Sequence, residues 1–452
     1  MAPVTRKRKS AKLESIETKP IIAPKLEPSE TKPTKIQLSE TKPKTPKIEP
    51  SETKPSETKP ITPKIEIDQV ISNQTDVALT LTKHILQNNN TSNVVLSPLS
   101  LQLVLSLVAA GSEGQTLEQL LSFLKAESTD ELNSFASHLV KHVFTGGSPS
   151  GEPTLSLANG VWIDKSLSFK PFFSKVVDDV YNAVSDVVDF QNKASEATDK
   201  VNSWIEKETN GLVKDTVPPD LFDDETKIVF ANAIYFKGSW VDPFHVWETE
   251  TFDFNLLNDG CVQVPFMTNH MMDAYISAFD DFKVLKLPYM RVRDTRKISM
   301  YIFLPDAKDG LPTLVDKLSS ESGFLERHLP NHSQVLGKFW IPKFKVSFGF
   351  EAKEALKEFG VIEPFIPGGL DKMVDSEKIE LLYVSNIFQK SSIEVNESGT
   401  EAAASSRLSM CGGGCPPVRI DFVADHPFLF FIREDTTGVV LFVGQVLNPL
   451  VT

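Results

Sequence analysis

The run KIVFANAIYF at Lys227–Phe236 constrains the fold of this chain more than any other stretch. It is apolar almost throughout and shows no alternation of apolar and polar residues. This pattern is typical of a strand that is covered on both faces. Helical patterns are frequent before this run, and strand patterns dominate after it. We therefore predict an α+β fold in which other layers cover both faces of a central sheet.

The strongest helical pattern lies in SNVVLSPLSLQLVLSLVAAGSEGQT. Ser97 is a suitable N-cap, Pro98 suits the first helical position, and Gly111 is expected to end the helix. The residues between them are apolar nearly all round, so this helix should be buried. Further helical patterns are expected at Val70–Leu86, Leu117–Phe123, Glu131–His142, Phe172–Val180 and Glu196–Lys207.

Strand patterns follow the central run, and one precedes it. Each combines β-branched and aromatic residues in a short stretch bounded by turn residues. The clearest stretches are TLSLANGVWI, KVLKLPY, ISMYIFLP, FWIPKFKVSF, KSSIEV, PFLFFIRE and GVVLFVGQVLNP.

The first 67 residues differ from the rest of the chain in composition. They hold 15 Lys and Arg against 9 Asp and Glu, a net charge of +6, whereas the remaining residues have 32 basic and 51 acidic side chains, a net charge of −19. They contain 11 of the 30 prolines and no Phe, Trp, Tyr or Gly. Such a segment cannot bury enough apolar surface to offset the entropy lost on ordering. We predict a disordered tail at residues 1–67 and a folded domain at 68–452.

The tail carries a repeat and a basic cluster. Ser-Glu-Thr-Lys-Pro occurs four times, which favours extended or polyproline-II backbone and indicates a tethering tail. Four adjacent positive charges near the start are typical of a nuclear-import signal or of a plain solvated charge run. This cluster consists of Arg6, Lys7, Arg8 and Lys9. We expect no nucleic-acid partner, because phosphate would repel the acidic body.

Other partners and compartments are constrained by what the sequence lacks. There is no run of 18 apolar residues and no apolar signal-peptide core at the N-terminus, so no membrane partner is expected. With three cysteines and no signal, a reducing cytoplasmic or nuclear location is expected.

Many stretches of residues 68–452 match those of one known family in the same order. They include NVVLSPLS, VNSWIEKETNG, FANAIYFKGSW, IPKFKV, EVNESGTEAAAS, DFVADHPFLFFI and GVVLFVGQV. On these stretches, residues from about 68 to 452 resemble the serpin family, and its plant branch most closely.

The resemblance implies a serpin fold of three β-sheets and eight or nine helices, with an exposed reactive loop near the C-terminus. Inhibitory members are suicide substrates. A protease cleaves the loop and forms an acyl-enzyme, and the loop then inserts into the largest sheet and carries the protease with it. The implied partner is a serine or cysteine protease, and a monomer is expected. Because many family members are extracellular, secretion remains an alternative location.

A loop that enters a packed sheet needs small side chains and a flexible start. Gly399 permits a bend, and Thr400, Ala402 and Ala404 share one face of the extended loop. Glu401 lies on the other face, where it would point to solvent. The hinge predicted from the family motif comprises Glu397, Gly399, Thr400, Glu401, Ala402, Ala403, Ala404 and Ser405. Taken alone, the alanine run would favour a helix or an ordinary loop.

Opening of the sheet depends in the family on a buried polar network. Ser97, Ser100 and Asn232 match its serines and its asparagine, and Gln389 stands where the family often has histidine. Glutamine can donate and accept, so the network can survive the change. The alternative is that these residues are ordinary polar groups of the core.

The bait of the predicted loop, the short stretch that a protease would cleave, has an unusual sequence. Counting from the hinge and counting back from the following strand give different scissile residues, so the candidates are Cys411, Gly412, Gly413 and Gly414. Glycine fills no specificity pocket and provides little binding energy. Cys411 and Cys415 can be free thiols on an exposed loop, a small disulfide ring that the glycines would allow to close, or part of a metal site. The metal site is disfavoured because no third or fourth ligand lies near, and free thiols are favoured.

No enzyme site is predicted, and no cofactor or metal is expected. The histidines are scattered, no phosphate-binding glycine loop is present, and His426 matches a structural position of the family. The leading interpretation is a protease inhibitor that acts by loop insertion. A non-inhibitory serpin used as a binding module is the alternative, and a nuclear adaptor that acts through its tail is a third possibility.

Overall fold

The computed structural model describes residues 64–144, 154–269, 273–291, 295–320, 322–375, 382–400 and 419–452. The chain divides into two units, Met1–Pro60 and Ile61–Thr452, and all described residues belong to the second. The first helix of this second unit begins at Lys64, before residue 68, where the composition predicted the folded domain to begin.

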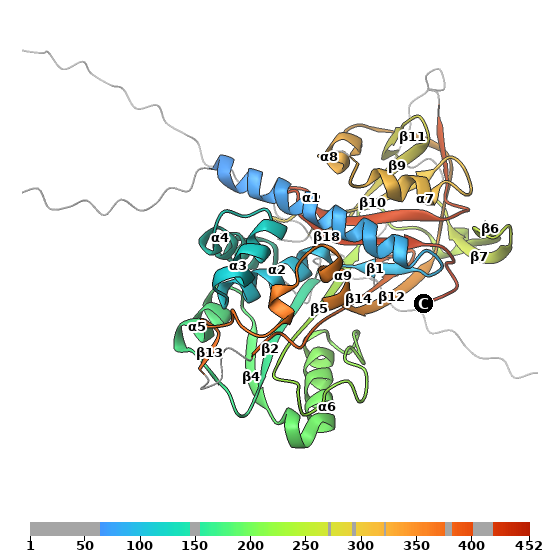
Figure 1. The fold of residues 1–452 in the computed structure, drawn as a ribbon. Coiled ribbons are helices and arrows are strands. Elements are labelled where there is room, and N and C mark those ends of the chain that lie inside the picture. Colours follow the sequence, from blue (N-terminus) through green and yellow to red (C-terminus); the bar gives the residue numbers. More distant parts are fainter. Residues whose placement is uncertain are drawn as a thin grey trace, which may run out of the picture. The chain divides into compact units, whose positions relative to one another are not determined.

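Nine α-helices occur in the described part of the chain, and most of them precede the long central strand (Figure 1). They are α1 (Lys64–Asn88), α2 (Pro98–Ala110), α3 (Gly114–Phe123), α4 (Thr129–Leu139), α5 (Pro171–Asp179), α6 (Phe190–Glu208), α7 (Leu311–Lys317), α8 (Phe324–His328) and α9 (Lys353–Glu358). Short turns of other helical type are η1 (Val140–Phe144), η2 (Val246–Glu248) and η3 (Glu363–Phe365).

The strands of the described residues form three sheets, as the family resemblance implies. A six-stranded sheet has the order β12-β14-β5-β2-β4, with the short β15 paired to β5. These strands are β2 (Thr154–Asp164), β4 (Val184–Val188), β5 (Ile228–Ser239), β12 (Phe344–Glu351), β14 (Asn386–Val395) and β15 (Gly399–Thr400).

A ten-stranded sheet has the order β1-β18-β17-β10-β9-β8-β11-β7-β6, with β16 paired to β11. Its strands are β1 (Val94–Leu96), β6 (Glu250–Asn255), β7 (Cys261–Met267), β8 (Asp273–Ala278), β9 (Phe282–Pro288), β10 (Ile298–Pro305), β11 (Ser333–Pro342), β16 (Ile420–Val423), β17 (Phe428–Glu434) and β18 (Val440–Val446). The third sheet pairs β3 (Ser168–Phe169) with β13 (Val374–Asp375).

Helix α2 is buried along its whole length, as its apolar sequence predicts. Its N-cap is Ser97, whose hydroxyl accepts a hydrogen bond from the Ser100 N–H at 3.3 Å, and Gly111 ends the helix. The main core lies around α2 and includes Phe230, Ile234 and Phe236 of β5. This helix therefore covers one face of the six-stranded sheet.

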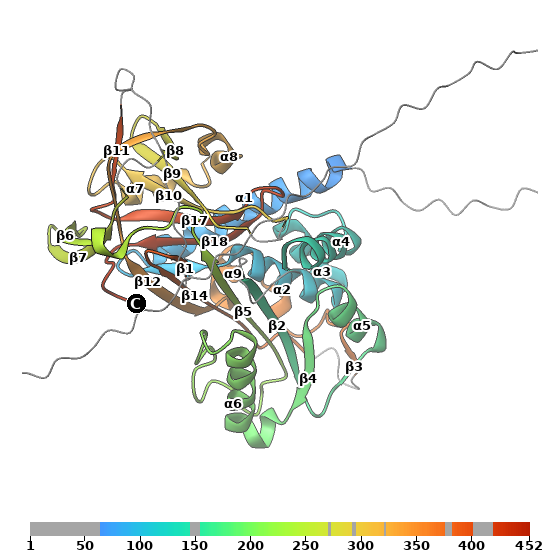
Figure 2. The ribbon, with the colours of Figure 1, turned by 180° about the vertical axis from the view of Figure 1, so that it is seen from behind.

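Helix α6 covers the other face of the six-stranded sheet (Figure 2). Val201 and Ile205 of this helix share a second apolar cluster with Val229, Ala231 and Ala233 of β5. Strand β5 is thus covered on both faces, as its apolar run predicts. Among the described residues, no helix combines the length and apolarity that crossing a membrane would require.

Candidate functional site

The site predicted from the sequence centres on the junction between β5 and β14. These two strands run parallel, with a register from Asn386 opposite Val229 to Ser392 opposite Tyr235. Their other neighbours in the sheet, β2 and β12, are antiparallel to them. The middle of the sheet is therefore a parallel pair between two antiparallel pairs. We call the β5–β14 pair the seam.

A row of amide side chains crosses the seam. Asn159 of β2 lies opposite Asn232 of β5, which lies opposite Gln389 of β14. The Asn232 amide donates to the side-chain oxygen of Asn159. The Gln389 amide donates to the Ser97 carbonyl oxygen and to the Ser100 hydroxyl, each at 2.6 Å. Gln389 thus links the seam to the N-terminus of α2.

Most of this row, but not its pairing, was predicted from the sequence. Ser97, Ser100 and Gln389 are brought together as predicted, whereas the hydrogen bond of Asn232 goes to Asn159 instead. Asn159 was missed. The signal available was a lone asparagine within the apolar strand pattern LANGVWI, since a buried amide must find a partner.

Three buried polar atoms in the seam strands have no hydrogen-bond partner within the described protein. They are Asn232 Oδ1, Gln389 Oε1 and Ser391 Oγ. A buried polar atom without a partner costs about 1–3 kcal/mol. The seam is therefore held together by apolar contacts and by backbone hydrogen bonds between β5 and β14, while these three side-chain atoms lack a hydrogen-bond partner. Such a junction is a favourable place for a sheet to part.

The chain turns back on itself after β14. Gly399 and Thr400 form β15, which pairs antiparallel with Ser239 and Gly238 at the end of β5. Gly399 has φ +145, and an added Cβ would overlap the Gly238 carbonyl oxygen. Only glycine fits this conformation and this close approach. The bend predicted at Gly399 is therefore present, and it directs the chain toward the seam.

Glu397 fastens the turn between β14 and β15. Its side chain is 7% exposed, and its carboxylate lies 2.9 Å from the Lys343 ammonium. It also accepts a hydrogen bond from the Thr249 hydroxyl at 2.9 Å. Burial alone would raise the pKa of the Glu397 carboxyl, but the hydrogen bonds to Lys343 and Thr249 and the positive charge of Lys343 outweigh it and hold this pKa below its ordinary value. The group is ionised at neutral pH.

Aromatic side chains hold the same turn. The Trp240 indole N–H donates to the Asn396 carbonyl oxygen at 3.0 Å, and the Trp240 backbone N–H donates to the Ser398 carbonyl oxygen at 2.9 Å. The Tyr289 hydroxyl lies 2.8 Å from the Thr400 hydroxyl. Burial raises the pKa of Tyr289, so this phenol stays neutral. Glu397, Trp240 and Tyr289 together hold the start of the predicted loop against the end of β5.

Part of the predicted site cannot be placed. The hinge residues beyond Thr400 and the scissile candidates lie outside the described residues, as does the basic cluster of the tail. These residues are Glu401, Ala402, Ala403, Ala404, Ser405, Cys411, Gly412, Gly413, Gly414, Arg6, Lys7, Arg8 and Lys9.

Two further side chains that could carry chemistry lie outside the seam. His426 has its ring nitrogens 2.7 Å from the Asp425 carboxylate and 2.7 Å from the Pro305 carbonyl oxygen. It connects two segments of the ten-stranded sheet, in agreement with a structural role. Cys261 lies near the edge of the same sheet. It is the first residue of β7 and an exposed free thiol.

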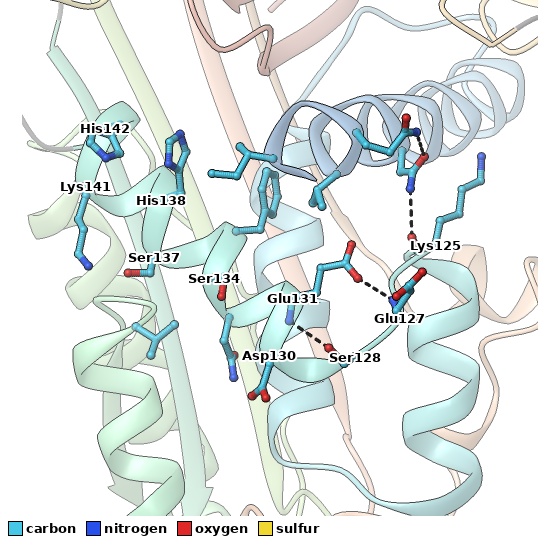
Figure 3. Close-up of a pocket in the computed structure, with 17 residues that line it drawn as sticks. Lys125, Glu127, Ser128, Asp130, Glu131, Ser134, Ser137, His138, Lys141 and His142 are labelled. Carbon is cyan, nitrogen blue, oxygen red and sulfur yellow. Dashed lines mark hydrogen bonds between the residues drawn. The ribbon is translucent and has the colours of Figure 1, made fainter. Parts of the chain in front are cut away.

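A separate groove of about 1260 Å³ lies between α1 and α4 (Figure 3). Glu131 at one end accepts a hydrogen bond from the Glu127 N–H. His138 and His142 lie at the other end, with ring centroids 4.5 Å apart. Burial and the neighbouring His142 lower the pKa of His138. Within the described part of the chain, no three His, Cys, Asp or Glu side chains are grouped to hold a metal ion.

Comparisons with known proteins agree with this geometry. The family described as "Serpin (serine protease inhibitor)" matches residues 72–449. Serpin-ZX of Arabidopsis thaliana is 50% identical over 389 residues, which is 85% of this chain and 99% of the relative. Serpin-ZXA of Oryza sativa subsp. japonica is 49% identical over 360 residues, 79% of this chain and 90% of the relative.

Solved structures of serpins also match this chain over most of its length. The Arabidopsis protein AtSerpin1 in its native stressed conformation matches with a TM-score of 0.78 and 50% identity, covering 85% of this chain and 99% of that one. Serpin48 of the insect Tenebrio molitor matches with a TM-score of 0.72 and 28% identity, covering 86% of this chain and 99% of that one.

Proposed function

The chain belongs to the serpin family of protease inhibitors, and we propose that it traps its target by inserting its own cleaved reactive loop into the seam. The loop would become a new strand between β5 and β14. The chain acts on a protease as an inhibitor, so no catalytic residue of its own is proposed.

The observation that carries the proposal is the register of β15. Gly399 and Thr400 already pair antiparallel with the last residues of β5. If the same register continued, Ala402 would lie opposite Phe236, and Ala404 opposite Ile234. These β5 residues point into the main core. The small residues of the hinge would thus occupy the core face, and Glu401 would occupy the opposite face beside Lys237.

The energetics of the seam favour such an insertion. A strand that enters after the turn at Gly399 runs antiparallel to both β5 and β14. One parallel pair would then be replaced by two antiparallel pairs, which are slightly more stable per residue. Insertion can therefore release free energy that the native sheet retains.

The chemistry requires a protease that forms a covalent acyl-enzyme. Its serine or cysteine nucleophile attacks the scissile carbonyl carbon, and the peptide C–N bond breaks. The residue after the scissile bond leaves with a free amine, while an ester or thioester joins the protease to the loop. Insertion must then outrun hydrolysis of this bond by water. We place the scissile bond within Cys411–Cys415.

The test is incubation with serine and cysteine proteases, followed by denaturing electrophoresis. The mechanism predicts a covalent complex that survives denaturation, with a fragment released from the loop C-terminal to the scissile residue. A variant with Ala402→Arg serves as the control, because a charged side chain cannot enter the core face of the seam. We expect this variant to be cleaved as a substrate without forming the complex.

The alternative is a non-inhibitory serpin that binds partners through the same fold. It gains support from the three-glycine bait and from Gln389 in place of histidine. Cleavage within Cys411–Cys415 that never yields a covalent complex, for any protease tested, would decide for this alternative.

A further inference from the structure

The turn that connects β5 to β6 carries two very exposed apolar side chains. Val246 is 68% exposed and Trp247 is 79% exposed, and both belong to the single turn η2. The Trp247 indole stacks on the His245 ring, with centroids 4.4 Å apart and an interplanar angle of 13°. Stacking orders the indole while leaving most of its surface in water. We call Val246 and Trp247 the exposed pair.

An exposed tryptophan of this kind is costly for a solitary protein. Apolar surface in water is unfavourable by about 25 cal/mol per Å². Tryptophan is also among the residues that contribute most to binding at protein interfaces. Ordered, solvent-facing indole surface next to a second apolar side chain is therefore typical of a docking position.

The same connecting segment fastens the start of the reactive loop. The Phe244 N–H donates to the Glu397 carbonyl oxygen at 2.8 Å, and the Thr249 hydroxyl donates to the Glu397 carboxylate. These two residues flank the exposed pair in the sequence. The exposed pair thus lies beside the point at which the loop leaves the sheet.

The segment also lies beside the point at which the loop returns. The Phe244 ring packs on the Phe339 ring of β11, with centroids 5.5 Å apart. Phe339 is the register partner of Phe422 in β16, the first strand after the loop. The exposed pair is therefore bracketed by both ends of the loop. Because both ends of the loop are fixed beside this turn, a protease that holds the loop would come close to it.

The bait supplies the reason for a second contact. Glycine at the scissile region offers the specificity pocket of a protease no side chain, so most of the binding energy must come from elsewhere. We propose that Val246 and Trp247 form a second docking surface for the protease that the loop engages. The partner feature is an apolar depression outside the active cleft. Because Asp242 and Glu250 lie near this turn, a basic rim around that depression complements it.

This inference rests on the proposed function and is tested with it. Papain serves as the cysteine-protease probe and subtilisin as the serine-protease probe. The second-order rate of covalent complex formation is measured for the full chain and for Trp247→Ala. We expect a fall of at least about tenfold for each probe that forms the complex, as expected for loss of a buried tryptophan contact. Trp247→Phe should restore part of the rate.

The matched control is Phe172→Ala. Phe172 is 63% exposed on α5, which lies far from β6 in both views (Figures 1 and 2). This variant should react at the rate of the unmodified chain. A purely structural role of Trp247 is tested by the melting temperature before and after loop cleavage, and we expect Trp247→Ala to leave both values unchanged.

The outcomes separate the two proposals. Trp247→Ala that reacts as fast as the unmodified chain with every complex-forming probe overturns the second docking surface and leaves the trapping mechanism intact. A covalent complex with neither probe overturns both proposals. A slower reaction accompanied by lost stability would assign Trp247 a structural role and also overturn the docking surface.

Discussion

Replacing Glu397 by glutamine tests how firmly the start of the loop is held. The carboxylate contacts the Lys343 ammonium at 2.9 Å and the Thr249 hydroxyl at 2.9 Å, and it is almost fully buried. The substitution keeps the size of the side chain and one acceptor oxygen. It places an NH₂ donor group where the second carboxylate oxygen was, next to a positively charged donor.

The expected cost follows from these contacts. A hydrogen bond to a charged group contributes about 1.5–3 kcal/mol. The Lys343 side chain is 37% exposed, so solvent screens part of the ion pair. We therefore expect Glu397→Gln to lower the free energy of unfolding by about 2 kcal/mol at pH 7. Urea unfolding at constant slope measures this change directly.

The effect has a defined pH dependence. The pKa of Glu397 is lowered in the folded protein, so the charged form contributes stability above the unfolded pKa of about 4.3. This contribution is lost as pH falls through the lower, folded pKa. The difference between the unmodified chain and Glu397→Gln should therefore shrink toward zero below about pH 4.

The matched control is Glu394→Gln, near the end of β14 and just before the turn that holds Glu397. Glu394 pairs with Lys345 at 3.1 Å, but its side chain is 40% exposed and that of Lys345 is 53% exposed. Exposed pairs contribute about 0–1 kcal/mol. Equal losses for Glu397→Gln and Glu394→Gln, or a Glu397→Gln loss that is independent of pH, would refute the reasoning.

Three further substitutions test the seam and the hinge. Gly399→Ala should destabilise the protein by about 1–3 kcal/mol through its positive φ and its overlap with Gly238, with thermal melting as the measure. Gly368→Ala is the control, because Gly368 also has positive φ but has open space where an added Cβ would lie. An equal loss of stability in the two variants would mean that the overlap with Gly238 contributes nothing. Gln389→Leu should lower the free energy of unfolding by about 1–3 kcal/mol, because Ser97 and Ser100 lose a buried hydrogen-bond donor. Urea unfolding that shows no loss would mean that Gln389 does not hold β14 to the start of α2. Tyr289→Phe should cost about 0.5–1.5 kcal/mol by removing the hydroxyl beside Thr400, and unchanged hydrogen exchange at Thr400 would argue against that contact.

The sequence was most informative where local patterns decide the structure. The cap at Ser97, the stop at Gly111 and the apolar surface of α2 all follow from neighbouring residues, and all are present. The run at Lys227–Phe236 likewise predicted a strand covered on both faces. In each case the residue pattern that decides the structure lies within the element itself or directly beside it.

Long-range pairing could not be predicted in the same way. Periodicity does not indicate that β14 pairs with β5, or that Asn232 bonds to Asn159 on a distant strand. Lys343 was missed because a lysine in a strand pattern carries no sign that it faces Glu397. The contact between Glu397 and Lys343 therefore becomes apparent only once the strands are placed.

The exposed pair illustrates a different limit. Val246 and Trp247 are apolar in sequence, and composition alone would place them in a core. Their exposure arises because η2 is a single turn between two sheets, with Phe244 directed inward and the next residues directed outward. Only the structure distinguishes such a surface from the interior.

The central claim is that the seam opens to admit the loop, and melting after loop cleavage tests it most directly. Insertion adds about ten backbone hydrogen bonds at about 1 kcal/mol each. We therefore expect the melting temperature of protein cleaved within Cys411–Cys415 to exceed that of the intact protein by more than about 10 °C. An unchanged or lower melting temperature after complete cleavage would contradict the account.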